Sequence, residues 1–118
     1  MICNVKNIEE QQVCGLEYAF KRIGGKYKAR ILWLLRANNT LRYGELRRAF
    51  PDMSTKMLTQ CLKELDHDKL IFRKMYHQVP PKVEYSLTNT GEQLIPFFEH
   101  LNEWAQNEMA NENTISTI

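Results

Sequence analysis

The segment from Ser54 to Asp68 combines two kinds of side chain at helical spacing. Its apolar residues share one face of a helix with 3.6 residues per turn, and they are Met57, Leu58, Cys61, Leu62 and Leu65. The opposite face carries hydrogen-bond donors, methyl groups and positive charge without an acid, in Thr55, Lys56, Thr59, Gln60 and Lys63. In a DNA major groove, lysine can meet guanine, glutamine can meet adenine and a threonine methyl can meet thymine. The pattern fits either a helix that contacts base edges or an ordinary half-buried surface helix.

The cysteines are the second set of reactive side chains. Cys3, Cys14 and Cys61 are odd in number and widely spaced, so they form neither a disulfide framework nor a CxxC zinc pattern. This usage predicts a cytoplasmic protein with reduced thiols. A thiolate at Cys14 could be favoured by a helix N-terminus or by the nearby lysines, whereas a small buried hydrophobe is the commoner role of a free cysteine. Cys61 is expected in the core, and Cys3 could pair between subunits.

No set of residues is suited to catalysis or to holding a cofactor. His67, His77 and His100 are far apart and lack an HExxH or triad-like pattern. Gly24-Gly25-Lys26 lacks the GxxxxGK[ST] spacing of a phosphate-binding loop. We therefore predict no catalytic residue, no metal site, no cofactor and no enzymatic activity.

The distribution of charge suggests a polyanionic partner for part of the chain. The 118 residues suffice for one domain, and no apolar run approaches the roughly 20 residues that would span a membrane. The N-terminus also lacks the apolar segment of a signal peptide. All 16 Lys and Arg residues lie at or before Lys82, with eight acids, while six acids follow it. A basic body with an acidic C-terminal segment fits a nucleic-acid partner, although small domains also distribute charge unevenly.

The elements that must position these residues follow in order. Residues 1–13 predict a weakly ordered arm, and Leu16–Ile23 a short amphipathic helix that Gly24-Gly25 ends. Tyr27–Ala37 predicts a buried central helix, and Leu41–Tyr43 a short strand. Tyr43–Phe50 predicts a helix with Leu46, Ala49 and Phe50 facing inward, which Pro51-Asp52 ends before Ser54 caps the next helix. Two helices joined by a tight turn form a helix-turn-helix.

A basic hairpin is predicted after this helix pair. Leu70–His77 is rich in strand-forming residues, and Lys82–Leu87 alternates polar and apolar side chains around a loop with two prolines. Basic side chains lie on the hairpin or near its tip, in Arg73, Lys74, His77 and Lys82. The hairpin is either an ordinary surface hairpin or the wing of a winged helix-turn-helix.

A long C-terminal helix is predicted over Thr88–Met109. Pro96 should kink it or mark a late start. Its apolar stripe is broad and consists of Leu94, Phe97, Phe98, Leu101, Trp104, Ala105 and Met109. The stripe could pack on its own domain or form a self-association surface with Leu16–Ile23 of a second copy. Residues 110–118 are expected to form a flexible tail.

The chain resembles the HxlR-type winged helix-turn-helix transcriptional regulators, which are related more loosely to the MarR type. The resemblance covers about Cys14 to Met109 in the family's order and spacing. It rests on the following segments: Cys14–Ala19, Ile23–Lys28, Arg42–Arg48, Ser54–Gln60 and Val79–Thr88, with Gly91. One departure is Lys69, which stands where the family usually has glycine at a helix end. A left-handed conformation there would cost a non-glycine residue about 1 kcal/mol.

The resemblance implies a mainly α winged helix-turn-helix with a small β-hairpin and an additional C-terminal dimerisation helix, over residues 14–109. It implies a homodimer on an inverted-repeat operator in double-stranded DNA, without a membrane partner. The expected DNA contacts are Arg42, Ser54, Thr55, Lys56, Thr59, Gln60, Lys63, Lys74, His77 and Lys82. The expected dimer interface is Leu16, Tyr18, Ala19, Leu94, Phe97, Phe98, Leu101, Trp104 and Met109.

The sequence leaves two questions open: what regulates the protein, and whether it recognises a specific operator. Some members of the family sense oxidants or electrophiles through a cysteine at the position of Cys14, so a redox or small-molecule inducer is one expectation. A winged-helix interaction module that dimerises without specific operator recognition is the alternative function.

Overall fold

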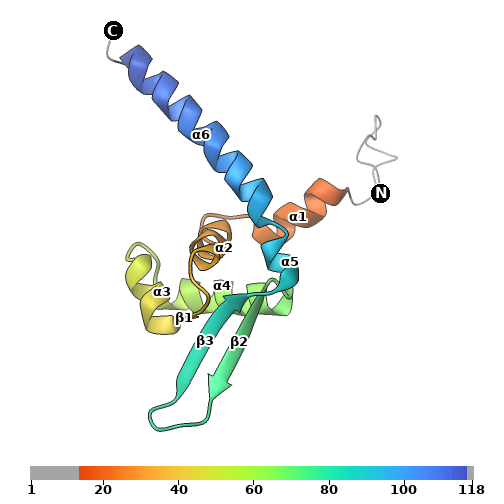
Figure 1. The fold of residues 1–118 in the computed structure, drawn as a ribbon, viewed down its shortest axis with the longest axis vertical. Helices are drawn as coiled ribbons and strands as arrows, with labels where there is room; N and C mark the ends of the chain where they lie inside the picture. Colours follow the sequence, from red (N-terminus) through yellow and green to blue (C-terminus); the bar gives the residue numbers. More distant parts are fainter. Residues whose placement is uncertain (1–13, 117–118) are drawn as a thin grey trace.

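Four helices contact a small antiparallel sheet in the computed structural model, which describes residues 14–116 (Figure 1). The elements in chain order are α1 Gly15–Ile23, α2 Lys28–Arg36, β1 Leu41–Arg42, α3 Tyr43–Ala49, α4 Thr55–His67, β2 Ile71–Tyr76, β3 Lys82–Leu87, α5 Asn89–Glu92 and α6 Ile95–Ser116. The predicted winged helix-turn-helix architecture is confirmed. Among the described residues, no helix is both long and apolar enough to cross a bilayer. The predicted arm over residues 1–13 lies outside the described residues.

The α3–α4 pair forms the predicted helix-turn-helix. Ser54 caps α4, and its Oγ accepts a hydrogen bond from the Met57 backbone N–H at 3.1 Å. Leu58, Leu62 and Leu65 are fully or almost fully buried and fix α4 to the core around α2. The inward stripe is narrower than predicted, because Met57 is exposed and Cys61 is half-buried. Met57 lies about 100° around the helix from Leu58, which places it beside the stripe.

The neighbouring helix α3 also has a narrower inward side than predicted. Leu46 and Phe50 are buried as expected, whereas Ala49 is exposed at the end of the helix. Leu46 and Phe50 lie four residues apart on the same side, so they cover the contact with the core without Ala49.

The wing is the β2–β3 hairpin, with β1 on the other side of β3 in the sheet order β1-β3-β2. The strand predicted at Lys82–Leu87 is confirmed with the same bounds. Arg73 pairs with Tyr85, and Ile71 with Leu87. Because residues two apart on a strand share a face, Ile71 and Arg73 point to the same side of the sheet as Tyr85. Ile71 and Tyr85 are buried there, so this is the side that packs against the helices.

The single C-terminal helix expected at Thr88–Met109 is in fact two helices. The hydroxyl of Thr88 accepts from the Gly91 backbone N–H at 3.0 Å and caps the short α5. Pro96 then lies in the first turn of α6, where its missing N–H has no intrahelical partner to lose. The sequence from 97 to 116 contains no glycine or proline, so α6 continues to Ser116 instead of ending at Met109. The tail predicted at 110–118 therefore overlaps the helix.

Lys69 adopts the left-handed conformation that the sequence comparison with the family suggested, with a φ of 61°. The Lys69 N–H donates to the Asp66 carbonyl at 3.0 Å, and the Leu70 N–H donates to the Leu65 carbonyl at 2.9 Å. These two bonds form a Schellman motif, which favours glycine at the position of Lys69.

We expect Lys69→Gly to raise the free energy of unfolding by up to about 1 kcal/mol, because glycine adopts this φ without steric cost. Urea denaturation with an unchanged m-value would measure the gain. A lower midpoint for Lys69→Gly would show that the lysine side chain stabilises the turn by more than its backbone strain costs.

Candidate nucleic-acid interface

The recognition flank, which we define as Thr55, Lys56, Thr59, Gln60 and Lys63, lies on the side of α4 opposite to its buried leucines. Four of the five residues are exposed, and Thr59 is half-buried. Among the described residues, neither Lys56 nor Lys63 forms a hydrogen bond or an ion pair. The two ammonium groups are therefore available to a partner outside the chain.

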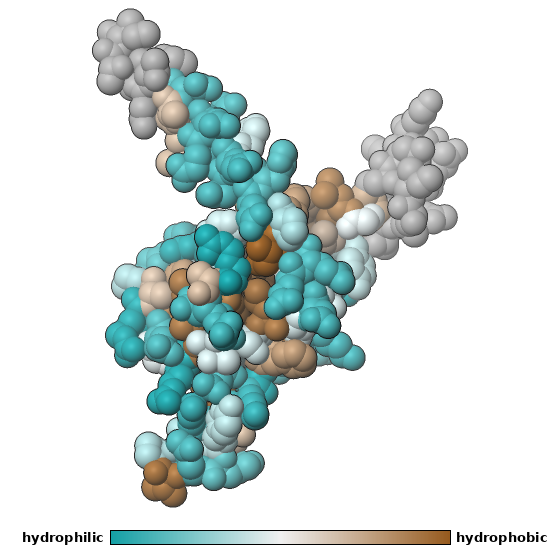
Figure 2. Space-filling view, in the orientation of Figure 1, coloured by the Kyte–Doolittle hydropathy of each residue, from teal (hydrophilic) through white to brown (hydrophobic). Residues whose placement is uncertain are grey.

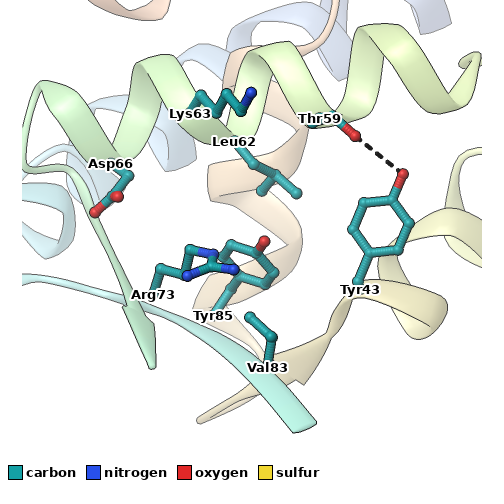
Figure 3. A pocket seen from close by; sticks show the side chains of 8 residues that line it. All are labelled: Tyr43, Thr59, Leu62, Lys63, Asp66, Arg73, Val83 and Tyr85. Carbon is teal, nitrogen blue, oxygen red and sulfur yellow. Dashed lines mark hydrogen bonds between the residues drawn. The ribbon is translucent and has the colours of Figure 1, made fainter. Parts of the chain in front are cut away.

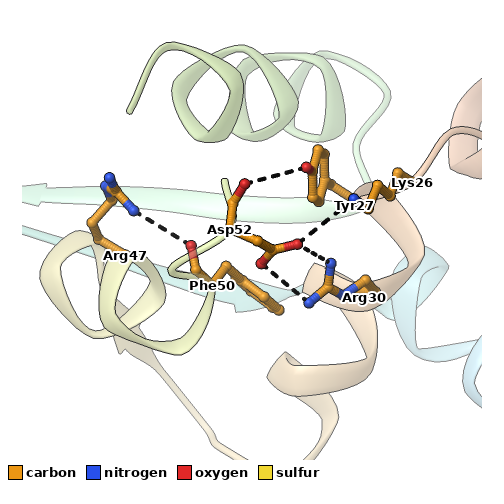
Figure 4. Close-up of polar contacts among 6 residues, drawn as sticks. All are labelled: Lys26, Tyr27, Arg30, Arg47, Phe50 and Asp52. Atoms are coloured by element: carbon orange, nitrogen blue, oxygen red, sulfur yellow. Dashed lines mark hydrogen bonds and ion pairs between the residues drawn. The ribbon is translucent and has the colours of Figure 1, made fainter. Parts of the chain in front are cut away.

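Helix α3 holds the first turn of α4 in place. The Arg47 Nε donates to the Thr55 Oγ1 at 3.3 Å. The Nη1 of Arg47 donates to the Phe50 carbonyl at 3.4 Å, as Figure 4 shows. The Tyr43 hydroxyl donates to the Thr55 carbonyl at 3.4 Å and lies 3.2 Å from the Thr59 Oγ1. Two threonines of the recognition flank thus also position the helix. Sequence analysis missed Arg47 and Tyr43 in this role, because their partners depend on how α3 and α4 are packed.

Gln60 is oriented by a neighbouring carboxylate. Its Nε2 donates to Glu64 at 3.0 Å, and Glu64 also accepts from the Lys28 Nζ at 3.0 Å. The hydrogen bonds from Lys28 and Gln60 lower the pKa of Glu64. Because an amide nitrogen carries two hydrogens, Gln60 keeps one N–H and its oxygen for the two edge atoms of an adenine.

The wing presents the remaining predicted DNA contacts in two different environments. Lys74 and His77 are exposed on the hairpin. Lys82 is more constrained: its side chain is 24% exposed, its Nζ lies 3.6 Å from Glu84, and it sits over the Tyr76 ring at 4.7 Å. Hydrogen bonding by Tyr76, followed by the charge of Lys82, lowers the pKa of Glu84. Because Glu84 neutralises part of its charge, Lys82 would bind a DNA phosphate more weakly than a free lysine would.

Arg42 and Ser54 are the N-cap residues of α3 and α4 and are the remaining predicted DNA contacts outside the wing. Arg42 is exposed where β1 passes into α3, and its backbone N–H donates to Glu45 at 2.8 Å. Its guanidinium forms no hydrogen bond or ion pair with the part of the chain that the structure describes. Ser54 is exposed, but its hydroxyl is already committed as a cap, so it fits a backbone contact better than a base contact.

An ion-pair cluster ties α2 to the turn between α3 and α4 (Figure 4). Asp52 accepts from Arg30 at 3.0 and 3.5 Å and lies 3.9 Å from the Lys26 Nζ. The Tyr27 hydroxyl donates to the Asp52 carbonyl at 3.5 Å. Lys26 and Lys28 are thus each paired with an acid, so neither is a free cation for Cys14.

The Asp52 cluster makes a prediction about acid stability. The hydrogen bond from Arg30 lowers the pKa of Asp52 below its ordinary value of 3.8. A carboxyl whose pKa is lower when folded stabilises the fold fully above its unfolded pKa, and the stabilisation is lost as pH falls through the folded pKa. We therefore expect the stability difference between the unchanged chain and Asp52→Asn to shrink between about pH 5 and pH 3 in urea titrations. Because the pair is exposed to solvent, the effect should be small and reduced by salt. If the stability difference between the two proteins stays constant across this pH range, Asp52 does not contribute to the pH dependence of stability.

Apolar side chains remain exposed on α1 and α6. Figure 2 shows brown side chains over α1 and at the base of α6. The predicted interface residues that are exposed are Leu16, Tyr18, Phe97, Leu101, Trp104 and Met109, and Ala19 is half-buried. Phe20, which lies in the predicted partner segment Leu16–Ile23 but was not among the individual residues predicted for the interface, is 52% exposed on α1. A groove of about 220 Å³ runs between α2 and α6, where Ala29 and Trp33 face Phe98 and Leu101.

Two residues predicted to lie in the dimer interface pack on their own domain. Phe98 is 6% exposed and belongs to the core, and Leu94 is half-buried against the same core. Leu94 directly precedes α6 and Phe98 lies in its first turn. This end of α6 contacts α2, whereas the rest of the helix extends away from the domain. Their apolar character therefore serves the fold of this chain.

The described cysteines differ in state. Cys14 is buried at the N-cap of α1 and is disulfide-bonded, so the prediction of reduced thiols is wrong for this residue. Cys61 carries a free thiol, and burial raises its pKa. Cys3 lies outside the described residues. Within residues 14–116, no three His, Cys, Asp or Glu side chains converge as metal ligands would.

Comparison with known proteins agrees with this architecture. The HxlR-like helix-turn-helix family model matches residues 22–113. The uncharacterized HTH-type transcriptional regulator YkvN of Bacillus subtilis is 48% identical over 91 residues, which cover 77% of this chain and 76% of the relative. The oxidized form of the redox regulator HypR is 40% identical with a TM-score of 0.75, covering 80% of this chain and 96% of its own. Its reduced form is 37% identical with a TM-score of 0.76, covering 87% and 98%. The chain therefore belongs to the HxlR-like helix-turn-helix family of transcriptional regulators.

Proposed function

We propose that this regulator binds a specific inverted-repeat operator in double-stranded DNA as a homodimer, with α4 in the major groove. The observation that carries the proposal is the contrast between the two sides of α4. Its recognition flank is exposed, while Leu58, Leu62 and Leu65 on the opposite side are buried in the core. A rigidly anchored helix can hold Lys56 and Gln60 at fixed positions against base edges.

Backbone contacts would orient the helix in the groove. Arg42, Lys74 and His77 are exposed around α4, and Lys82 lies close by on the wing. Basic side chains on such flanking elements bind phosphates and set the register without reading sequence. Thr55, Thr59 and Lys63 complete the recognition flank, and Ser54 presents its backbone at the start of the helix.

Dimerisation would use the exposed apolar faces of α1 and α6. In a two-fold dimer the same surfaces meet on both subunits, so the groove between α2 and α6 could receive the exposed Leu16 and Phe20 of the second copy. Such a dimer would present two α4 helices to half-sites about one DNA turn apart, roughly 34–36 Å.

Fluorescence anisotropy and gel shifts with the upstream region of the protein's own gene would test the proposal. We expect binding that exceeds that of a scrambled duplex by about 10³-fold or more at physiological salt. Log affinity should fall linearly with log salt, at about −0.9 per phosphate neutralised. A stable dimer that binds both duplexes equally would favour the interaction module instead.

We also propose that Cys14 makes operator binding sensitive to oxidants. The proposal rests on the position of Cys14 at the N-cap of α1, a helix that exposes an apolar surface, and on the similarity to HypR, which is named a redox regulator. Cys14 is disulfide-bonded in the structure, so reduction of this bond to two thiols, and its closure again by an oxidant, would alter the chain beside the proposed dimer surface. Helix N-termini favour the thiolate that such oxidation requires.

Dithiothreitol, which reduces the Cys14 disulfide to thiols, is expected to increase operator binding by the unchanged protein, and later treatment with diamide, which closes the disulfide again, is expected to release the DNA. Cys14→Ser should bind DNA normally and lose the response to diamide, whereas Cys61→Ser should keep it. A Cys14→Ser protein that still releases DNA on diamide treatment would exclude Cys14 as the sensor.

A further inference from the structure

A cavity of about 320 Å³ lies between α4 and the sheet, next to the recognition flank. Figure 3 shows side chains from α3, α4, β2 and β3 around it. Its inner wall is apolar and formed by Leu62, Val83 and Tyr85, of which Leu62 and Tyr85 are buried. This wall can cover the apolar body of a small ligand. The volume is at the lower end of the range for ligand sites, so the occupant must be small.

The charged side chains at the cavity are not paired with one another. Arg73, from β2, points into the space, while Lys63 and Asp66 line it from α4 (Figure 3). Among the described residues, none of these three side chains forms a hydrogen bond or an ion pair. By contrast, Lys28 and Arg30 each have a carboxylate partner at 3.0 Å. One cation therefore points into the cavity, and a second cation and an anion lie along its α4 side, all three with the hydrogen-bonding capacity of their side chains unused.

The other end of the cavity carries hydroxyl groups. The Tyr43 hydroxyl lies 3.2 Å from the Thr59 Oγ1, and both residues line the space. A hydroxyl or carbonyl on a ligand could join this pair as a donor or an acceptor. The cavity thus combines an apolar wall, a cationic side and a neutral polar end.

We propose that this cavity binds a small monocarboxylate with an apolar ring or branched body. The carboxylate would accept charge-assisted hydrogen bonds from Arg73, whose planar guanidinium matches two carboxylate oxygens, and would be attracted by Lys63. The apolar body would lie against Val83 and Tyr85. A dicarboxylate fits less well, because Asp66 would repel a second negative charge.

The effect on DNA follows from shared residues and rests on the proposed operator binding. Lys63 and Thr59 belong both to the recognition flank and to the cavity. A bound carboxylate would neutralise Lys63 and place negative charge beside the path of the DNA backbone. Such a ligand binds the DNA-free protein better than the complex and therefore lowers operator affinity.

Benzoate is a suitable probe, with benzamide as a neutral molecule of nearly the same shape. In ¹H–¹⁵N NMR titrations we expect benzoate to shift the amide signals of Arg73, Val83 and Lys63 with a Kd on the order of 1 mM, as fits a ligand of about nine non-hydrogen atoms. Benzamide should bind at least about tenfold more weakly, because it lacks the charge-assisted hydrogen bonds.

Variants separate the cavity from general surface charge. Arg73→Met should weaken benzoate binding about tenfold, while Lys74→Met, the neighbouring cation on the opposite face of β2, should leave it unchanged. Asp66→Asn should strengthen binding about threefold, because it removes the repelling acid. Equal binding of benzoate and benzamide, or unchanged benzoate affinity in both Arg73→Met and Asp66→Asn, would overturn the proposal.

The benzoate titrations, combined with the operator-binding measurements, distinguish this inference from the proposed function. If the protein binds its operator and benzoate does not bind at Arg73, the ligand site is rejected and operator binding stands. If benzoate binds at Arg73 and no operator preference exists, the site stands and its regulatory role is rejected. If benzoate binds and operator affinity is unchanged at saturating benzoate, the competition between ligand and DNA is wrong.

Discussion

Trp104→Asp is expected to separate the proposed dimer into monomers and to abolish tight operator binding. Trp104 is 60% exposed on α6, so the substitution should leave the core of each subunit intact. A buried tryptophan in an interface often contributes about 2 kcal/mol or more, and a two-fold dimer contains the residue twice. The dissociation constant of the dimer should therefore rise about 1,000-fold. A monomer could engage only one half-site, so operator affinity should fall by at least about 100-fold.

Sedimentation velocity would measure the dimer, and anisotropy with operator DNA would measure binding. Gln106→Asp is the matched control, because it adds the same charge to α6 about 200° around the helix from Trp104. We expect this control to remain dimeric. Dimers of unchanged stability in Trp104→Asp, or equal dissociation in both variants, would exclude this face of α6 as the interface. Phe98→Ala is unsuitable as a test, because Phe98 is in the core and its loss should destabilise the fold by about 3–5 kcal/mol.

Replacing residues of the recognition flank and of the wing should affect DNA binding in different ways. Lys56→Ala and Gln60→Ala are expected to cost about 1–3 kcal/mol per half-site on the operator, because each removes a base contact. Gln60→Ala should leave the affinity for scrambled DNA and the salt slope unchanged, because glutamine is neutral. Lys82→Ala should weaken all duplexes about equally and reduce the salt slope by less than one for each subunit, because Glu84 already neutralises part of the lysine charge.

The measurement is a set of operator and scrambled-duplex affinities over a salt series for the three variants. Glu64→Gln is a useful companion, since Glu64 orients Gln60 while also holding Lys28. Operator affinity that stays the same in Lys56→Ala, Gln60→Ala and Lys82→Ala would reject the assigned contacts. Because Lys82 is partly neutralised by Glu84, its effect should be the smallest of the three on the operator.

The local features of this protein could be predicted from its sequence. The cap at Ser54 and the left-handed Lys69 involve hydrogen bonds between residues a few positions apart, and the bounds of the Lys82–Leu87 strand follow from its alternation of polar and apolar side chains. The same holds for the two faces of α4, since side-chain direction along a helix depends only on its period. The family resemblance, which rests on the order of such local motifs, was confirmed by the comparisons.

Only the tertiary structure decided which of the predicted surfaces remain exposed and which charges are paired. Arg30 and Asp52 are 22 residues apart, and Lys28 and Glu64 are 36 apart, so no local pattern could pair them. The same limit explains why Phe98 belongs to the core while Phe20 is exposed, since both occupy apolar positions of amphipathic helices. The cavity beside Arg73 likewise exists only because β2 and α4 meet across the fold. Helical periodicity determines which residues share a face, but the packing of whole elements determines what that face meets.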